Sequence, residues 1–429
     1  YVLGWGGYWF WDPVENASLI PWLTGTALVH SAIVVEKREA LKIWTVLLAI
    51  GTFSFSLSGT FLVRSGILNS VHAFANDPAR GVFILGLLAV VIGGSLLLFA
   101  IRAPQLTTGG LFAPMSREGL LVLNNILLCS ICAVVLTGTM YPPFMSLLFG
   151  KTISVGKPFF DATTIPLAIP LMVFMGFGPM VPWKRAQMWP VLRRLWWAAC
   201  VSLLALVVAT FRMRDILPVL ATATAVWVIC SSVADIVERL RLFRQSPAQS
   251  WQRARGLPRA VFGAALAHAG VGITVLGIAG MSQAAHRIVE VHVGQSEMLA
   301  GDSWTLTEVH PAQGPNYTAL VATIEVRHDG RLITTLHPSK RTFASQHQTT
   351  TEVAIHTNLM ADIYGVLGDR HGSDADPTYV LRLHYNPLAP WMWLGGLIMA
   401  FGGVLSLSDR RVRVGAPRRA KAADMVAAR

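Results

Sequence analysis

Long apolar runs dominate the pattern of this chain, and short polar segments separate them. A run of about 20 apolar residues folded as an α-helix crosses roughly 30 Å of hydrocarbon, because each residue adds about 1.5 Å. The pattern therefore predicts membrane-spanning helices rather than a soluble domain. The nine predicted spans cover residues 17–35, 42–62, 82–101, 119–140, 164–182, 195–211, 216–236, 261–281 and 390–408.

The segment between the last two spans has a different pattern. Polar and apolar residues alternate over short stretches such as 318–327, and turn residues such as Asp329-Gly330 follow, which is typical of β-strands. The predicted fold is mainly α: a polytopic membrane helix bundle of about nine spans with one outward β-rich domain before the last span. The predicted division is 1–81 (aromatic segment, first two spans and a loop with a histidine), 82–281 (helix bundle), 282–389 (β-rich domain), 390–408 (last span) and 409–429 (basic tail).

The basic residues predict how the chain crosses the membrane. Of the 35 Lys and Arg residues, 22 lie in every second segment between the spans and in the tail. Lys and Arg accumulate in cytoplasmic segments, so these segments and the C-terminus are predicted to face the cytoplasm. Residues 1–16, the loop 63–81 and the β-rich segment 282–389 then face outward together.

Composition agrees with a membrane protein. The chain has 429 residues, of which 53% are apolar and 14% charged, and its mean hydropathy is +0.52. The net charge of +12 follows the loops between spans, which argues against nucleic acid as a partner. No disulfide framework is expected, because the four cysteines lie inside apolar runs. Since the chain opens at Tyr1 inside a dense motif, we expect it to be the C-terminal part of a longer protein.

Four consecutive aromatic residues follow two glycines near the start of the chain. Trp and Tyr gather at membrane interfaces, so one interpretation is an interfacial belt. The other is a platform for a flat, apolar macrocycle, because adjacent aromatic side chains point in different directions and glycines permit close backbone approach. The residue chemistry leaves both open. The candidate platform consists of Trp5, Gly6, Gly7, Tyr8, Trp9, Trp11 and Asp12.

This segment resembles the tryptophan-rich "WWD" motif of haem-handling proteins. Within that group the chain resembles the CcmF family, which usually has Trp in place of Tyr8. The resemblance is dense through residue 100 and looser beyond it. It is carried by residues 5–18 (WGGYWFWDPVENAS), 21–23 (PWL), 25–28 (GTAL), 30–31 (HS), 36–37 (EK), 59–66 (GTFLVRSG), 70–75 (SVHAFA) and 77–81 (DPARG).

Two histidines, His30 and His268, lie inside predicted spans. Intramembrane polar residues are costly, so each is either a functional residue or hydrogen-bonded across a helix interface. Both lie roughly 8–11 Å below the predicted cytoplasmic face, because they are about five and seven residues from the ends of their spans. Two imidazoles at one depth could bind one iron from opposite sides. The resemblance implies the same: these positions hold a haem b within the membrane. Small residues around His268, from Gly263 to Gly272, would let a porphyrin or a neighbouring helix approach.

His72 lies in the loop predicted to face outward. The resemblance implies that it is one axial ligand of a second haem, the substrate, whose other ligand precedes the aromatic motif in the family. Arg64 and Arg80 are either propionate contacts, because guanidinium binds carboxylate in a bidentate way, or interface anchors. The histidines of the β-rich segment show no metal-ligand spacing and are interpreted as surface residues.

The resemblance implies a haem lyase subunit of cytochrome c-type biogenesis in the bacterial inner membrane. Such a protein binds haem, reduces it through the membrane haem b with quinol as a possible donor, and ligates it to CXXCH motifs of apocytochrome c. Its partners would be a periplasmic haem carrier protein, apocytochrome c and thiol-reducing adaptor subunits. The alternatives are a haem transporter, a non-catalytic scaffold of the maturation complex, and a relative dedicated to nitrite reductase. The chain has no CXXCH and no Walker A motif of its own.

Overall fold

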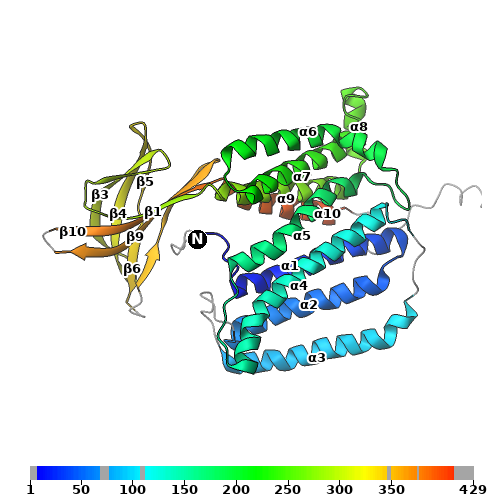
Figure 1. The fold of residues 1–429 in the computed structure, drawn as a ribbon, viewed down its shortest axis with the longest axis horizontal. Coiled ribbons are helices and arrows are strands. Elements are labelled where there is room, and N and C mark those ends of the chain that lie inside the picture. Colours follow the sequence, from blue (N-terminus) through cyan, green and yellow to red (C-terminus); the bar gives the residue numbers. More distant parts are fainter. Residues whose placement is uncertain (1–6, 68–76, 107–111, 345–348, 374–375, 410–429) are drawn as a thin grey trace, which may run out of the picture. The chain divides into compact units, whose positions relative to one another are not determined.

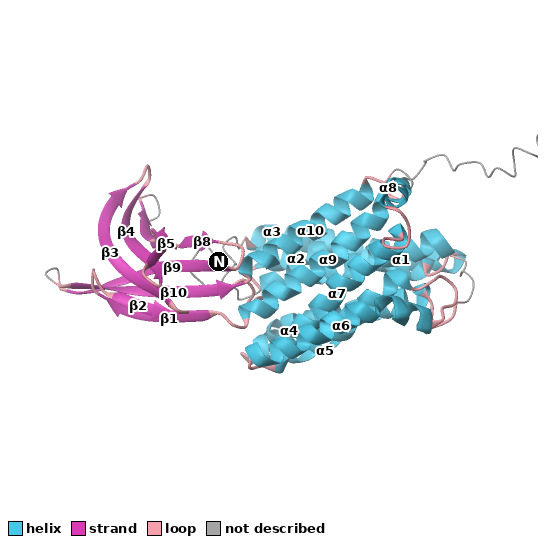
Figure 2. Cartoon of the chain, turned by 90° about the horizontal axis from the view of Figure 1, so that it is seen from above, coloured by secondary structure: helices cyan, strands magenta, loops and turns pink. Residues whose placement is uncertain are grey.

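The computed structural model describes residues 7–67, 77–106, 112–344, 349–373 and 376–409. Within these residues nine helices are long and apolar enough to cross a membrane, and one β-rich domain precedes the last of them. Figure 1 shows the order of the elements along the chain, and Figure 2 separates helices from strands by colour. The predicted fold class is confirmed. Contacts divide the chain after Arg193 into two units, each described by itself below.

Five spanning helices form the first unit. Its helices pack in the pairs α1 with α2, α1 with α4, α2 with α3, and α4 with α5. Their shared core contains Leu23, Ala27, Leu128, Val135 and Phe160. The helices are α1 (Pro13–Arg38), α2 (Lys42–Ser65), α3 (Pro78–Arg102), α4 (Arg117–Phe149) and α5 (Lys157–Phe177), with short 3-10 turns η1 (Ala103–Gln105) and η2 (Gly178–Met180).

Glu118 fixes one end of this unit. Its side chain is fully buried, and Arg38 Nε at the end of α1 donates to Oε1 over 2.7 Å. The backbone N–H of Lys184 donates to both carboxylate oxygens, at 3.1 and 2.9 Å. A buried carboxylate needs such donors, because an unpaired one would be strongly destabilising. Glu118 therefore ties α1, α4 and the segment after η2 together.

The second unit contains α6 (Met188–Arg212), most of which follows the division, and the remaining helices. The short helix α8 (Pro247–Gly256) lies in a basic segment and was not predicted from the sequence, because it contains no long apolar run. The pairs α9 with α10 and α7 with α9 form the main helix contacts. The other helices are α7 (Ile216–Leu240), α8 (Pro247–Gly256), α9 (Arg259–Met281) and α10 (Ala389–Leu407).

Glycines set the close packing of α9. A Cβ atom on Gly270 would lie 2.7 Å from the carbonyl oxygen of Gly395 in α10, and one on Gly402 would lie 2.6 Å from that of Gly263. A Cβ on Gly272 would lie 2.8 Å from the carbonyl oxygen of Ala225 in α7. Small residues at such positions let helix backbones approach closely in a membrane. The sequence leaves open whether the small residues near His268 admit a porphyrin or a neighbouring helix. Gly263, Gly270 and Gly272 of α9 contact neighbouring helices.

The β-rich domain is a sandwich of two antiparallel sheets between α9 and α10. One sheet has the order β1-β10-β9-β8, and the other β2-β3-β4-β6-β7, with β5 paired to β4. The strands are β1 (Ala285–Val291), β2 (Ser296–Leu299), β3 (Asp302–Gln313), β4 (Tyr317–His328), β5 (Arg331–Leu336), β6 (Ser339–Phe343), β7 (Thr349–Glu352), β8 (Ala354–Thr357), β9 (Ala361–Gly372) and β10 (Pro377–Pro387).

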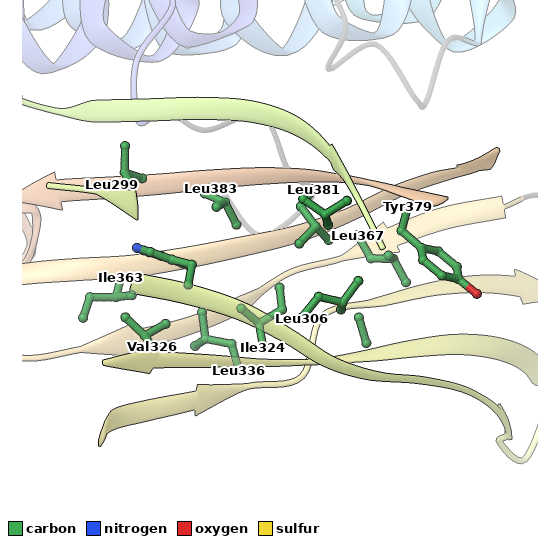
Figure 3. Close-up of a cluster of buried hydrophobic side chains, with 13 residues drawn as sticks. Leu299, Leu306, Ile324, Val326, Leu336, Ile363, Leu367, Tyr379, Leu381 and Leu383 are labelled. Atoms are coloured by element: carbon green, nitrogen blue, oxygen red, sulfur yellow. The ribbon is translucent and has the colours of Figure 1, made fainter. Parts of the chain in front are cut away.

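Alternating buried residues of β3 and β4 and a continuous buried run in β9 build the core of the sandwich. Leu306 and Ile324 come from one sheet and meet Leu367, Leu381 and Leu383 from the other, as Figure 3 shows. The predicted strand 318–327 lies within β4, and Asp329-Gly330 forms the turn to β5 with both residues at positive φ. Gly tolerates that conformation and Asp adopts it more readily than most residues, so the turn was readable from the sequence.

Candidate functional site

The aromatic segment is fixed against the start of α1. Asp12 caps the helix, because its Oδ1 accepts from the N–H of Val14 over 2.9 Å. Glu15 Oε2 accepts from the N–H groups of Phe10, at 2.8 Å, and Asp12, at 3.1 Å, which completes a capping box. The Asp12 carboxylate thus has a structural role as the N-cap of α1.

Trp11 is held by α5, a helix 150 residues further along the chain. Its indole stacks on the ring of Phe160, with centroids 4.8 Å apart and planes 10° apart, and its Nε1 donates to Asp161 Oδ1 over 3.0 Å. Trp9 packs edge-on against Trp11 at 5.8 Å. Sequence reasoning missed Phe160 and Asp161. An acidic residue in the first turns of an apolar span was the signal that could have found Asp161.

Gly7 and Tyr8 complete the described part of the segment. A Cβ on Gly7 would lie 2.6 Å from Cζ of Phe10, so a larger residue at this position would push the Phe10 ring aside. Burial, and then the negative charge of Asp161, raise the pKa of Tyr8 to about 12. Tyr8 therefore stays protonated at physiological pH and can act as a hydrogen-bond donor. Trp5 and Gly6 lie outside the described residues.

A cavity of about 520 Å³, wide open on one side, lies between the first turns of α1 and the last turns of α2. Its size is that of a small-molecule site. Apolar and small groups form most of its wall, and Arg64 is its one charged residue. Arg80 is not among the lining residues and instead pairs with Asp77 Oδ2 at 3.1 Å. The wall consists of Val14, Ala17, Ser18, Pro21, Ser56, Gly59, Thr60, Val63 and Arg64.

His30 lies further along α1, half-buried, and faces α4. Its Nδ1 is 3.1 Å from Nδ2 of Asn124. His30 follows Pro21 in the cavity wall by nine residues, so the two sites are about 14 Å apart along the helix. They lie at different depths of the same unit. The sequence analysis did not single out Asn124 as a partner of His30.

His268 lies on the face of α9 that points away from α10. It is five residues after Gly263 and two before Gly270, both of which contact α10. At about 100° per residue, His268 is roughly 140–160° around the helix from that contact. Its imidazole is half-buried and belongs to the second unit. Its pairing with His30 on one iron stays a prediction.

The remaining histidines lie in the loop after α2 and in the β-sandwich. His72 lies outside the described residues, so its role as an outer ligand stays a prediction. Three of the described sandwich histidines, His310, His356 and His384, are half-buried rather than exposed, and His384 lies between the rings of His286 and Tyr364. The exposed ones, as expected, are His286, His292, His328, His337 and His371, and His347 lies outside the described residues. No group of three or more His, Cys, Asp or Glu side chains suited to a metal ion occurs among the described residues.

Helices that span a membrane, followed by a β-sandwich between the last two of them, define a polytopic membrane protein with an extramembrane domain. Two family models match this chain: "CcmF C-terminal beta-sandwich" over residues 282–387 and "Cytochrome C assembly protein" over residues 2–68. The chain belongs to the CcmF family of cytochrome c-type biogenesis proteins.

Individual relatives support this assignment. The chain is 51% identical to the cytochrome c-type biogenesis protein CycK of Bradyrhizobium diazoefficiens, over 98% of this chain and 64% of the relative. It is 41% identical to CcmF of Escherichia coli K12, over 96% and 62%. The solved structure of a "Cytochrome c Heme Lyase CcmF" matches with a TM-score of 0.72 and 27% identity, over 95% of this chain and 62% of that one. The chain thus spans less than two thirds of the length of these relatives.

Proposed function

We propose that this protein binds haem and takes part in attaching it to apocytochrome c at the outer face of the bacterial inner membrane. The observation that carries the proposal is the apolar cavity between α1 and α2, directly after the aromatic segment, with Arg64 in its wall. A haem is an apolar macrocycle with two carboxylates. An apolar cavity with one guanidinium matches both properties.

The aromatic segment would hold the substrate haem beside this cavity. Trp11 anchors the segment to α5 through Phe160 and Asp161, and Trp9 packs edge-on against the Trp11 ring. Attachment adds each thiol of a CXXCH motif across one haem vinyl group: the sulfur bonds to one carbon and the hydrogen goes to the other. The protein's part is to orient the vinyl groups and the thiols, which lowers the entropic cost of the reaction.

His30 and His268 would hold a resident haem b in the membrane. The half-buried imidazole of His30, whose Nδ1 contacts Asn124, fits an iron ligand, because such histidines are fixed through their other ring nitrogen. When bound, this haem supplies one-electron transfer, with quinol as the donor and the substrate haem as the acceptor. The partners would be a haem carrier protein, apocytochrome c and its thiol-reducing adaptor subunits.

Replacement of His30 or His268 by Ala in the purified membrane protein tests the inner site. We expect the b-type absorbance and the pyridine haemochrome of the preparation to be lost, whereas replacement of the exposed His337 leaves both unchanged. Arg64→Gln should weaken binding of added haem without changing the b-type absorbance. Retention of full b-type absorbance in His268→Ala would refute the ligand assignment. Normal cytochrome c maturation without either histidine would favour the scaffold alternative.

A further inference from the structure

Two adjacent amides of α4 lie near His30: Asn124 contacts the His30 ring, and Asn125 contacts Asn124. Asn124 Nδ2 is 3.1 Å from His30 Nδ1 and 3.4 Å from Asn125 Oδ1. Asn125 is 1% exposed, and its Nδ2 has no hydrogen-bond partner in the described part of the chain. A buried amide group without a partner is costly inside a membrane helix. The buried pair of amides therefore calls for a functional explanation.

Adhesion between α1 and α4 explains only part of this arrangement. These helices are already joined by a second polar contact, in which Asn16 Nδ2 donates to Thr139 Oγ1 over 3.1 Å. Thr139 follows Asn124 by 15 residues, so the two contacts are about 22 Å apart along α4. An interhelical tie needs one amide, and it leaves the donor of Asn125 without a function.

Turning both amides by half a turn gives that donor an acceptor and leaves the oxygen of Asn125, which is less costly to bury without a partner, in the unpartnered position. An asparagine side chain keeps its shape when its oxygen and nitrogen exchange places. Asn124 Oδ1 then accepts from the Nδ1–H of His30 and from the Nδ2 of Asn125 at the same positions. With its proton on Nδ1, the neutral imidazole carries its lone pair on Nε2, which is the form that binds a metal. With the nitrogen of Asn124 toward His30, Nδ1 accepts and the opposite tautomer is favoured.

We propose that Asn124 and Asn125 are positioning residues that fix the tautomer and orientation of His30 for iron. The proposal rests on the proposed function, because it takes His30 as a ligand of the membrane haem. Asn124 accepts the Nδ1 proton, and Asn125 holds the amide of Asn124 in that orientation. The Thr26 carbonyl, one turn before His30, is a second hydrogen-bond acceptor for the ring, so loss of Asn124 weakens the hold on His30 without abolishing it.

The test measures haem affinity and midpoint potential in the purified membrane protein. Asn124→Leu should bind haem b about 10- to 100-fold more weakly, which haem transfer to apomyoglobin measures. It should also raise the midpoint potential, because the imidazole loses basicity when its Nδ1–H loses an acceptor. Asn124→Asp keeps acceptor oxygens, so it should retain haem and move the potential in the opposite direction. Asn125→Leu should shift both properties as Asn124→Leu does, by a smaller amount.

Thr139→Val is the matched control, because it breaks the other polar contact between α1 and α4. It should leave haem affinity and potential at the wild-type values. Wild-type behaviour of Asn124→Leu, or an equal shift in Thr139→Val, would overturn the positioning role while the haem site stands. Absence of haem b from the wild-type protein would instead overturn the proposed function, and this inference with it.

Discussion

Trp11 makes two contacts with α5 that fix its indole ring: a stack on Phe160 and a hydrogen bond to Asp161. Its ring thus supports the segment, while Phe10 remains 45% exposed. An interfacial belt and a ligand platform differ in whether the aromatic rings are held in place. A belt needs no fixed geometry, whereas a platform needs rings that cannot reorient, and the support from α5 favours the platform.

Asp161→Ala should loosen the aromatic segment. The hydrogen bond to Trp11 Nε1 is lost, and a bond to a charged acceptor contributes about 1.5–3 kcal/mol. Hydrogen exchange of residues 7–12 should accelerate, and the pKa of Tyr8 should fall from about 12, because the Asp161 charge that raises it is gone. Lys157→Met is the control: it removes only the exposed ion pair with Asp161, which is worth about 0–1 kcal/mol. Equal exchange in both variants would contradict the role of Asp161.

His384 makes the sandwich sensitive to acid. Burial, followed by the charges of His286 and Arg382, lowers the pKa of His384 from 6.5 to about 4. Between these two values the unfolded chain binds a proton that the folded chain does not. The stability of the sandwich should therefore fall as pH drops from about 6.5 to about 4, and level off below that for this group.

Hydrogen exchange of strand β10 at pH 7 and pH 5 measures this effect. Exchange rates corrected for intrinsic pH dependence should show less protection at pH 5 in the wild-type protein. His384→Gln should reduce that difference, whereas His337→Gln, at an exposed position, should keep it. The same loss of protection in His384→Gln as in the wild type would show that another group titrates.

At the scale of elements, the strand pair β1 and β10 leads directly into the helix pair α9 and α10. β1 follows α9 directly, β10 precedes α10, and the two strands pair antiparallel with His286 opposite His384. The helices then pack through the glycines of both. The sandwich is thus tied at both ends to one helix pair. A hydrogen bond from Trp391 Nε1 in α10 to the carbonyl of Leu359, at 2.9 Å, adds to the joint.

Substitutions at two neighbouring glycines of α10 distinguish the effect of helix packing from that of helix propensity. A Cβ on Gly395 would lie 2.5 Å from the backbone nitrogen of Thr274 and 2.6 Å from the carbonyl oxygen of Gly270. Gly395→Ala should therefore force α9 and α10 apart and destabilise the unit by about 1–3 kcal/mol. A Cβ on Gly396 would meet no described neighbour within 4 Å, so Gly396→Ala should be neutral or stabilising by up to about 1 kcal/mol. Thermal unfolding in detergent compares the two, and equal melting temperatures would refute the close-packing argument.

At the scale of the whole molecule, the predicted sidedness gives the sandwich and the α8 segment opposite faces of the membrane. The helix α8 ends with Arg253 and Arg255, in the most basic loop of the chain. The turn at Asp329 lies in the β-rich domain. Lys and Arg resist translocation in short loops, whereas long domains cross despite their charges.

Cysteine labelling of intact spheroplasts tests this orientation. Asp329→Cys should react with a membrane-impermeant maleimide from outside, because the turn is exposed. Gln252→Cys in α8 should react only after the inner membrane is opened. The native cysteines lie within the spanning helices, so the parent protein provides the background. Labelling of Gln252→Cys in intact spheroplasts, with protection of Asp329→Cys, would reverse the predicted topology.

The sequence alone determined the spans, the β-rich domain and the family. Apolar runs, strand alternation and the turn at Asp329-Gly330 are local patterns, and local patterns follow from the length and period of one element. The motif from Trp5 to Asn16 is likewise contiguous. His30 is recognisable because a polar residue inside a span is rare, and Arg64 because it lies in a contiguous family motif and guanidinium binds carboxylate.

Only the tertiary structure decided what those residues contact. Trp11 meets Asp161 across 150 residues, and His30 meets Asn124 across 94. Arg64 enters a cavity wall because α1 and α2 pack side by side, and the glycines of α9 serve α10 and α7. Helix packing selects these partners by the shapes of whole faces, and no local period of the sequence encodes which face meets which.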